Sequence, residues 1–264
     1  MAYSASDHTF VVCAYKNSPY LHECVDSVVN QLKPTNVLIA TSTPNEGIRQ
    51  IAQEYGIECF VRQGTSNIAD DWNFAISCAS TPLVTIAHQD DTYDKSYSTH
   101  MLDGINSVNA PLLYFTNYGE LRDGAVVDSN NLLKIKRKML WPLHDGAHAR
   151  SRFIRRTILS FGSAICCPSV TMVRPALSDP IFSRDYKCDL DWDAWERASR
   201  LEGSFFYDTN ILMHHRIHGE SETSALIQDS TRTQEDLKMF MRFWPAPVAR
   251  IINSVYIKSQ KSNG

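Results

Sequence analysis

The sequence predicts an α/β fold, in which a mainly parallel, Rossmann-like sheet is flanked by helices. Short runs rich in β-branched residues alternate with helical patterns along the first half of the chain, as in sheets built from strand–helix–strand units. One such run, 83–87, ends abruptly in polar and acidic side chains, which is where open α/β sheets bind ligands. The second half is less regular and ends in amphipathic helical patterns, so we expect a sheet-based domain followed by a helical C-terminal tail.

The composition is that of an ordinary soluble globular protein, with 264 residues, 43% hydrophobic and 21% charged. A net charge of −3 gives no general attraction to nucleic acid, and we expect no nucleic-acid partner. The seven cysteines are odd in number and lack the paired two-residue spacing of structural zinc sites. Neither a signal peptide nor an apolar stretch long enough to span a bilayer is apparent. These features predict a cytoplasmic protein with reduced thiols.

Four strands and three helices are expected in the first half. The strands are 9–14, 36–40, 58–62 and the run that begins at Leu83. The helices are one after Ser18–Pro19 with an apolar stripe from Leu21 to Leu32, one between a capping box at 43–46 and Gly56, and one with its inner face from Ile68 to Ala79. No Gly-x-Gly-x-x-Gly or Walker loop follows these strands, which argues against a dinucleotide or P-loop enzyme.

The second half is expected to contain short strands, a basic segment and an acidic helix start. The expected strands are 112–116, 125–127, 169–173, 204–207 and 211–218. Eight basic residues between Lys134 and Arg156 indicate either a solvated helical face or a site for anionic phosphate or lipid headgroups. An acidic turn at 189–193 runs into a helix, where acids also serve as caps. The tail has two apolar stretches separated by a break at 244–247.

Two adjacent carboxylates, Asp90 and Asp91, follow the fourth strand after His88 and Gln89. Both are expected at the rim of a crevice beyond the strand ends, outside the core. Neighbouring carboxylates repel each other, and a cation or a hydrogen-bonding ligand between them relieves that repulsion. A solvated Asp-Asp turn is the alternative interpretation of an isolated pair.

Residues 211–218 combine a strand-like run with three histidines. Alternation along a strand would place His214, Arg216 and His218 on one face, where they could converge on a diphosphate or a metal. A histidine that is satisfied within the core is the alternative.

Taken in order, these motifs resemble those of the family 2 inverting glycosyltransferases, which have the GT-A fold. The matching segments are 14–17 (Ala-Tyr-Lys-Asn) with 19–21, 27–31, Asn73, the DxD-like motif 88–91 (His-Gln-Asp-Asp), Asp191–Trp192, and 216–218 with Ser221 and Thr223. Each motif is loose, but their succession is fairly specific. The resemblance covers roughly residues 8–224.

The resemblance implies metal-assisted transfer of a sugar, with inversion, from a nucleotide-sugar donor to an acceptor hydroxyl in polysaccharide, lipopolysaccharide or other glycan biosynthesis. It implies that Asp191 is the catalytic base, and that Asp90, Asp91 and His218 hold a divalent cation, Mn²⁺ or Mg²⁺. The donor-binding positions that it implies are Ala14, Tyr15, Asn17, Ser42, Asn73, His88, Asp90 and Arg216. These residue types suit the chemistry, because a hard cation needs oxygen ligands and the attacking hydroxyl must lose its proton.

Three positions depart from the family pattern. The segment 40–43 lacks the acid that often binds the nucleobase, His88 replaces the first acid of the DxD-like motif, and Leu190 replaces the acid that commonly precedes the base. The first departure weakens any prediction of uracil. Because the central acids are retained, we expect activity, with an altered donor or metal preference as one consequence.

We expect a glycosyltransferase domain at 1–224, with a nucleotide-sugar-binding half at 8–117 and an acceptor-binding half at 118–224, and a helical tail at 225–264. The expected acceptor is a glycan or a lipid-linked glycan. Apolar positions beside Arg250, Lys258 and Lys261 suit peripheral contact of the tail with the cytoplasmic membrane face. Packing of the tail on its own domain, or on a second subunit of a homo-oligomer, is the alternative. A metal-dependent nucleotide-sugar hydrolase and a non-catalytic nucleotide-sugar-binding relative are the rival functions.

Overall fold

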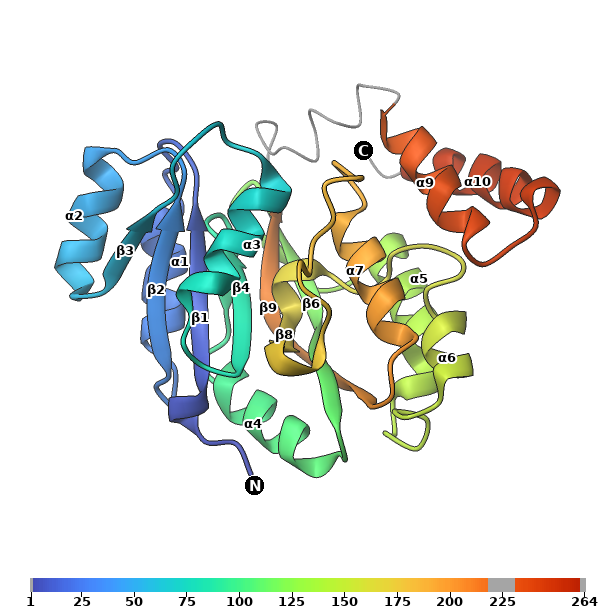
Figure 1. The fold of residues 1–264 in the computed structure, drawn as a ribbon, viewed down its shortest axis with the longest axis horizontal. Coiled ribbons are helices and arrows are strands. Elements are labelled where there is room, and N and C mark those ends of the chain that lie inside the picture. Colours follow the sequence, from blue (N-terminus) through green and yellow to red (C-terminus); the bar gives the residue numbers. More distant parts are fainter. Residues whose placement is uncertain (1, 218–230, 262–264) are drawn as a thin grey trace.

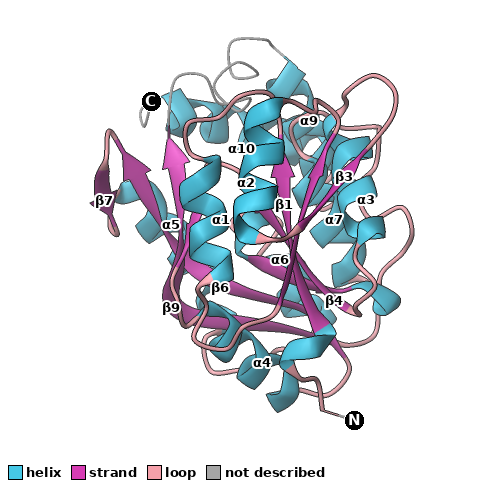
Figure 2. Ribbon diagram, turned by 90° about the vertical axis from the view of Figure 1, so that its left-hand side faces the viewer, coloured by secondary structure: helices cyan, strands magenta, loops and turns pink. Residues whose placement is uncertain are grey.

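The structure, a computed structural model, describes residues 2–217 and 231–261 (Figure 1). Within these residues, nine strands form one sheet in the order β3-β2-β1-β4-β8-β6-β9-β5, and β7 pairs with β6 at one margin of the sheet (Figure 2). The strands are β1 His8–Ala14, β2 Asn36–Thr41, β3 Glu58–Val61, β4 Leu83–His88, β5 Thr92–Tyr93, β6 Pro111–Arg122, β7 Ala125–Val127, β8 Val170–Val173 and β9 Ser204–Ile217. The predicted α/β class is confirmed.

Helices cover both faces of the sheet. The α-helices are α1 Leu21–Val29, α2 Glu46–Tyr55, α3 Ile68–Cys78, α4 Tyr97–Ser107, α5 Asn131–Leu140, α6 Arg152–Thr157, α7 Leu190–Ser199, α9 Thr231–Met241 and α10 Ala246–Lys261. Alternation along β1 divides the core: Phe10 and Val12 pack in a cluster with side chains of α1, α2 and α4, whereas Val11 packs in a cluster with side chains of α3, α7 and α9. The C-terminal helices α9 and α10 contact each other, so the predicted helical tail is present.

The sheet is parallel from β3 to β4 and mixed beyond that point, where β8 runs antiparallel to both β4 and β6. Two local predictions differ from the structure. The two strands predicted between 204 and 218 form one strand, β9, which pairs in parallel with β6. Asn45, and not Thr43, caps α2, because its side chain accepts a hydrogen bond from the Ile48 N–H at 3.0 Å.

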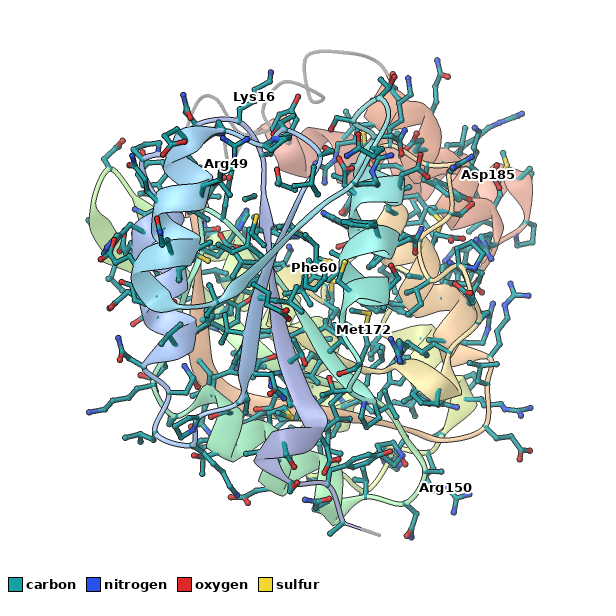
Figure 3. The ribbon with its side chains drawn as sticks, turned by 60° about the vertical axis from the view of Figure 1, so that its left-hand side comes forward. Lys16, Arg49, Phe60, Arg150, Met172 and Asp185 are labelled. Carbon is teal, nitrogen blue, oxygen red and sulfur yellow. The ribbon has the colours of Figure 1, made fainter. Side chains whose placement is uncertain are left out.

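The loops that follow β1, β2 and β4 meet at one end of the sheet, as the carboxyl ends of parallel strands must. Figure 3 shows Lys16, in the loop after β1, at this end, and Arg150 at the opposite end of the molecule. The predicted residues His218, Ser221 and Thr223 lie outside the described residues, as does the predicted domain boundary at 224/225.

Candidate active site

A pocket of about 500 Å³ lies beyond the carboxyl ends of β1, β2 and β4. Its walls come from these strand ends, from α3, α5 and the end of β9, from segments 161–168 and 187–191, and from Arg232 and Tyr256 of the C-terminal helices. The sequence analysis identified many of the residues that the fold brings together here: Ala14, Tyr15, Ser42, His88, Asp90, Asp91, Asp191 and Arg216. Most of them come from strand ends, which is why their positions could be predicted.

The loops after β1 and β4 are fastened to each other by one amide. The Gln89 side chain accepts a hydrogen bond from the Tyr15 N–H at 2.8 Å and donates one to the Tyr15 carbonyl at 3.0 Å. Because both bonds involve the backbone of Tyr15, they fix the position of the loop after β1 relative to the loop that carries Asp90. Ser18 adds a weaker contact to Asp90, with 3.3 Å between Oγ and Oδ1.

Asp91 does not stand at the rim of the crevice, as the sequence suggested, because its side chain is fully buried. Its Oδ1 atom lies 2.9 Å from Nδ1 of His215 and accepts a hydrogen bond from the Arg216 N–H at 3.0 Å. The prediction of a rim position is correct only for Asp90, which is partly exposed and lines the pocket. Asp91 therefore joins the β4 loop to the end of β9.

The charges around Asp91 explain how it can be buried. Burial raises the pKa of Asp91, but the positive charge and hydrogen bond of His215, together with His88 and the Arg216 N–H, outweigh this and hold the pKa below its usual value. Burial lowers the pKa of His215, yet the charge and hydrogen bond of Asp91 leave it raised overall. The two side chains therefore form an ion pair in the fold, with the carboxylate charged and the imidazole more readily protonated than usual.

His88 stacks on Trp72 of α3, with ring centroids 4.9 Å apart and an interplanar angle of 26°. Burial is the main cause of the lowered pKa of His88, so its imidazole is neutral at pH 7. Its Nε2 atom has no hydrogen-bond partner within the described residues. The neutral imidazole therefore forms part of the pocket wall, and its buried Nε2 atom has unused hydrogen-bonding capacity.

Arg216 crosses from the end of β9 towards the β4 loop. Its Nε donates to the Asp90 carbonyl at 2.8 Å, its Nη2 lies 2.6 Å from Glu23, and its guanidinium stacks 4.2 Å from the ring centroid of Tyr20. These contacts hold a fixed positive charge beside Asp90.

The sequence analysis missed an acidic residue of α3 whose side chain lies against Ser42, just after β2. Asp71 of α3 lines the pocket and accepts hydrogen bonds from Ser42 at 2.9 Å, from Ser66 at 2.7 Å and from Arg62 at 2.5 Å. An acid of α3 therefore lies beside Ser42, although segment 40–43 itself contains none. No sequence pattern placed Asp71 here, because acids in the first turn of a helix are common for capping reasons alone.

Asp191 lies at the start of α7, at the position that the family resemblance assigned to the base, and it lines the same pocket as Asp90. Burial raises the pKa of Asp191 to about 6, although the Trp192 N–H and the positive charges of Lys136 and Arg232 oppose the rise. Trp192, the next residue, is fully buried and its indole N–H donates to the Leu159 carbonyl at 2.9 Å. The carboxylate is therefore held on a well-anchored helix start.

Three predicted residues are not part of the pocket wall in the described structure. Asn73 instead exchanges two hydrogen bonds with the backbone of Phe182, at 2.8 and 3.0 Å. Asn17 lies in the loop after β1 but does not line the pocket. His214 lies 2.9 Å from Asp128, away from the pocket, and its neighbour His215 lines the pocket in its place.

The described residues include no group of three or more His, Cys, Asp or Glu side chains arranged to hold a metal ion. Two observations nevertheless fit a cation beside the β4 loop. The Oδ2 atom of Asp91 is buried with no hydrogen-bond partner in the described part of the chain, and Asp90 is the adjacent acid on the pocket wall. Both are the hard oxygen ligands that Mg²⁺ and Mn²⁺ prefer.

The model of Glycosyl transferase family 2 matches residues 9–174, which is more than half of the chain. The chain belongs to this family. The match covers the strands and loops that carry Asp90 and Asp91 but ends before Asp191. No curated protein matched the sequence of this family 2 member.

Solved glycosyltransferase structures share the fold of this family 2 chain. S. aureus TarS has a TM-score of 0.61 at 11% identity, covering 93% of this chain and 42% of TarS. TarS 1–349 in complex with UDP-GlcNAc has a TM-score of 0.60 at 13% identity, covering 95% and 71% of the two chains. The mannosyltransferase PcManGT from Pyrobaculum calidifontis, in complex with GDP-Man and Mn²⁺, has a TM-score of 0.59 at 13% identity, covering 97% and 70%.

At these identities the similarity is one of fold, and it shows the GT-A fold for this chain. The chain spans less than half the length of full-length TarS and about 70% of PcManGT. Among the described helices, none is both long enough and apolar enough to pass through a bilayer.

Proposed function

We propose that the protein transfers a sugar, with inversion and with the help of a divalent cation, from a nucleotide-sugar donor to an acceptor hydroxyl during glycan synthesis. One observation carries the proposal. A carboxylate with a pKa of about 6, Asp191, lies in the same pocket as the acids after β4 and the guanidinium of Arg216. Direct displacement needs these two kinds of group: a base for the attacking hydroxyl and positive charge for the departing diphosphate.

In this proposal Asp191 accepts the proton of the attacking hydroxyl while the acceptor oxygen bonds to the anomeric carbon. The bond from that carbon to the diphosphate oxygen breaks, and the nucleoside diphosphate leaves from the opposite face of the sugar. Arg216 is fixed beside Asp90 and offsets part of the charge that develops on the leaving group. Asp90 and Asp91 would hold the cation, which supplies further positive charge to the diphosphate when bound.

The donor half of the pocket offers contacts for a nucleoside. Ser42, which follows β2, and Asp71 of α3 are hydrogen-bonding groups, and Trp72, next to Asp71 in α3, also lines the pocket. An acid that accepts hydrogen bonds suits a base with N–H donors, as uracil and guanine both have. The nucleotide sugars in the complexes of the neighbouring structures, UDP-GlcNAc for TarS and GDP-Man for PcManGT, are therefore both reasonable first probes.

We expect UDP-sugars or GDP-sugars to raise the unfolding temperature in the presence of Mn²⁺, because a ligand that binds only the folded state stabilises it. Asp90→Ala should abolish the Mn²⁺-dependent part of this shift and leave the unfolding temperature of the ligand-free protein nearly unchanged, since Asp90 is partly exposed. A scan of nucleotide sugars with and without Mn²⁺ is the measurement. If no nucleotide sugar stabilises the wild-type protein under either condition, the proposed function is wrong.

The two rival functions make different products. A metal-dependent hydrolase releases free sugar from the donor at the same rate with or without an acceptor, whereas a transferase accelerates when the acceptor is added. A non-catalytic relative binds the nucleotide sugar and releases nothing. Product analysis of donor reactions with Mn²⁺, with and without acceptor, separates the three outcomes.

We also propose that the C-terminal helix contacts a membrane surface. Ala249 and Asn253 of α10 are buried on the protein, whereas Ile251 and Val255 are 66% and 63% exposed on the opposite side. The helix therefore packs on its own domain and still presents an apolar face to the outside, a pattern typical of helices that lie in an interface.

The basic segment 134–156 is not a single surface patch, contrary to one interpretation of its sequence. Arg155 is fully buried and donates to the Leu201 carbonyl, Arg156 pairs with Glu196, and Lys136 lines the pocket. Lys134, Lys138, Arg150 and Arg152 remain exposed. The segment therefore offers a membrane only part of the charge that its sequence suggests.

We expect the protein to sediment with vesicles that contain anionic lipid at low salt, and Ile251→Ser with Val255→Ser to weaken this binding. Apolar burial should persist at high salt, whereas the attraction of basic residues should fade with screening. Leu32→Ser, an exposed apolar position on another part of the molecule, is the matched control. Absence of binding at low salt, or dimerisation through α10 in solution, would contradict membrane contact.

A further inference from the structure

Three side chains from three separate helices share the pocket with Asp191. They are Lys136 of α5, Arg232 of α9 and Tyr256 of α10. Figure 1 shows these helices on the side of the molecule away from α1 and α2, with α9 and α10 coming from the far C-terminal part of the chain. The match to the family model ends at residue 174, so Arg232 and Tyr256 belong to the part of the chain beyond it.

Two basic residues of α5 point towards β6: Arg137 donates to the Tyr118 carbonyl at 3.0 Å and does not line the pocket, whereas Lys136 lines it. Its Nζ atom donates a hydrogen bond to the Tyr118 hydroxyl at 2.8 Å and lies 5.2 Å from the centroid of the same ring. Its neighbour Lys134 is exposed. Burial opposes the charge on Lys136, but Tyr118 and other nearby groups leave its pKa raised, so the pocket contains a permanent ammonium.

Arg232 brings a second permanent charge to the same region. Its Nε–H is buried and has no hydrogen-bond partner within the described residues. Burial works against its charge, but Tyr256 and the carboxyls of Asp236 and Asp189 leave its pKa raised. A buried N–H without a partner costs free energy unless a ligand accepts its hydrogen bond.

Tyr256 is held near these two cations by close packing. A side chain at Gly162 would place its Cβ atom 2.7 Å from the Tyr256 ring, so the glycine lets the ring approach the backbone. The ring also packs against Trp192, with centroids 6.3 Å apart, and Trp192 directly follows Asp191. Beside Gly162, the Ser163 hydroxyl also lines the pocket and has no partner in the described structure. The start of α7 thus faces several hydrogen-bond donors from different elements.

We infer that the acceptor carries a phosphate group close to the hydroxyl that Asp191 deprotonates, and that Lys136 and Arg232 bind this phosphate. The inference rests on the proposed function. In the proposed function, Arg216 and the acids after β4 already serve the diphosphate of the donor. Lys136 and Arg232 are further cations of the same pocket and both act on the charge of Asp191, so they suit a second anion beside the base. Donors that come from α5, from α9 and from Ser163 suit the several oxygens of a tetrahedral phosphate better than one flat carboxylate.

Electrostatics adds a reason for such an arrangement. The positive charges of Lys136 and Arg232 make Asp191 a weaker base. A phosphate bound between them would offset that effect, so the base would gain strength when the correct acceptor arrives. A neutral acceptor without a suitable hydrogen-bond acceptor would leave the buried Nε–H of Arg232 without a partner among the described residues, which costs free energy.

The test is calorimetric titration of the full-length protein, saturated with Mn²⁺ and either UDP or GDP. The probes are glycerol 3-phosphate and glycerol, which share hydroxyl groups and differ in the phosphate. We expect saturable binding of glycerol 3-phosphate and none of glycerol at millimolar concentrations. Lys136→Ala and Arg232→Gln should each weaken glycerol 3-phosphate roughly tenfold or more, the usual scale for a hydrogen bond to a charged group. Lys134→Ala and Lys238→Ala, exposed residues of the same two helices, should change nothing.

The outcomes separate this inference from the proposed function. If neither UDP nor GDP binds the wild-type protein, the proposed function fails, and the inference fails with it. If a nucleotide binds and glycerol 3-phosphate does not, only the inference is overturned. It is also overturned if Lys136→Ala and Arg232→Gln weaken the nucleotide and not glycerol 3-phosphate, because the two cations would then serve the donor. Unfolding temperatures of the variants identify any that fail to fold, and Arg232→Lys then replaces Arg232→Gln.

Discussion

Asp191→Asn should lower the turnover of sugar transfer by about a hundredfold or more and leave nucleotide-sugar binding almost unchanged. Asparagine keeps the size of the side chain and can still accept a hydrogen bond from the Trp192 N–H, but it cannot take a proton from the attacking hydroxyl. The helix start should stay in place, because Trp192 anchors it in the core. Single-turnover rates and donor affinities of the wild-type protein and the variant measure the two effects separately.

Asp193→Asn is the matched control, since it removes a carboxylate from the same turn of α7. Asp193 is buried and pairs with Arg197 at 2.9 Å and with Arg242 of the C-terminal region. It should therefore cost stability more than chemistry. If Asp193→Asn lost turnover at an unchanged unfolding temperature, and Asp191→Asn stayed active, the base would be misassigned.

The pH dependence of turnover should reflect the ionisation of Asp191. Burial raises the pKa of Asp191 to about 6, and only the deprotonated form can act as the base. Activity should therefore fall as the pH decreases through about 6, in the range where an ordinary aspartate, with a pKa of about 4, would still be charged. The residual activity of Asp191→Asn should not show this fall at low pH. If the variant shows the same fall, a group other than Asp191 causes it.

The N-terminal half of the fold could be predicted because its strands and helices carry regular patterns. β1 is buried on both sides and α2 has a proper cap and a left-handed Gly56, so sequence and structure agree within a few residues. The direction of β8 could not be predicted in this way. A short apolar strand buried on both faces has the same composition in parallel and antiparallel pairing, and long-range contacts decide between them.

The candidate site also has one part that sequence patterns predict and one part that depends on long-range packing. Residues at strand ends, such as Ser42 and Asp90, could be located because parallel strands end at one edge of the sheet. Lys136 and Arg232 reach the pocket through the packing of helices whose relative positions no local pattern specifies. His215 was missed for another reason: the alternation argument assumed that one face of β9 meets the pocket, whereas both His215 and Arg216 do so at its end.

Asp91→Ala should have the second large effect, because it should lower both the stability and the activity of the protein. The sequence suggested a carboxylate outside the core, whose removal would leave the fold intact. The structure instead buries Asp91 against His215 and the Arg216 N–H. Removing one partner of a buried pair costs roughly 3–5 kcal/mol, and the partial exposure of His215 reduces this to about 2–4 kcal/mol. Asp90→Ala, at the neighbouring and partly exposed position, is the control that should leave stability nearly unchanged.

The stability difference between the wild-type protein and Asp91→Ala should itself depend on pH. The pKa of Asp91 is lowered in the fold, so its contribution is present above the ordinary aspartate pKa of about 4 and is lost as the pH falls through the folded value. The pKa of His215 is raised, so its contribution is present below the ordinary histidine pKa of about 6.5 and is lost as the pH rises through the folded value. The difference should therefore be largest between about pH 4 and 6.5 and smaller at pH 8, as urea unfolding at several pH values would measure. Equal stability of the two proteins at every pH, combined with lost Mn²⁺-dependent donor binding, would mean that Asp91 acts only as a metal ligand and that the pair with His215 contributes nothing to the fold.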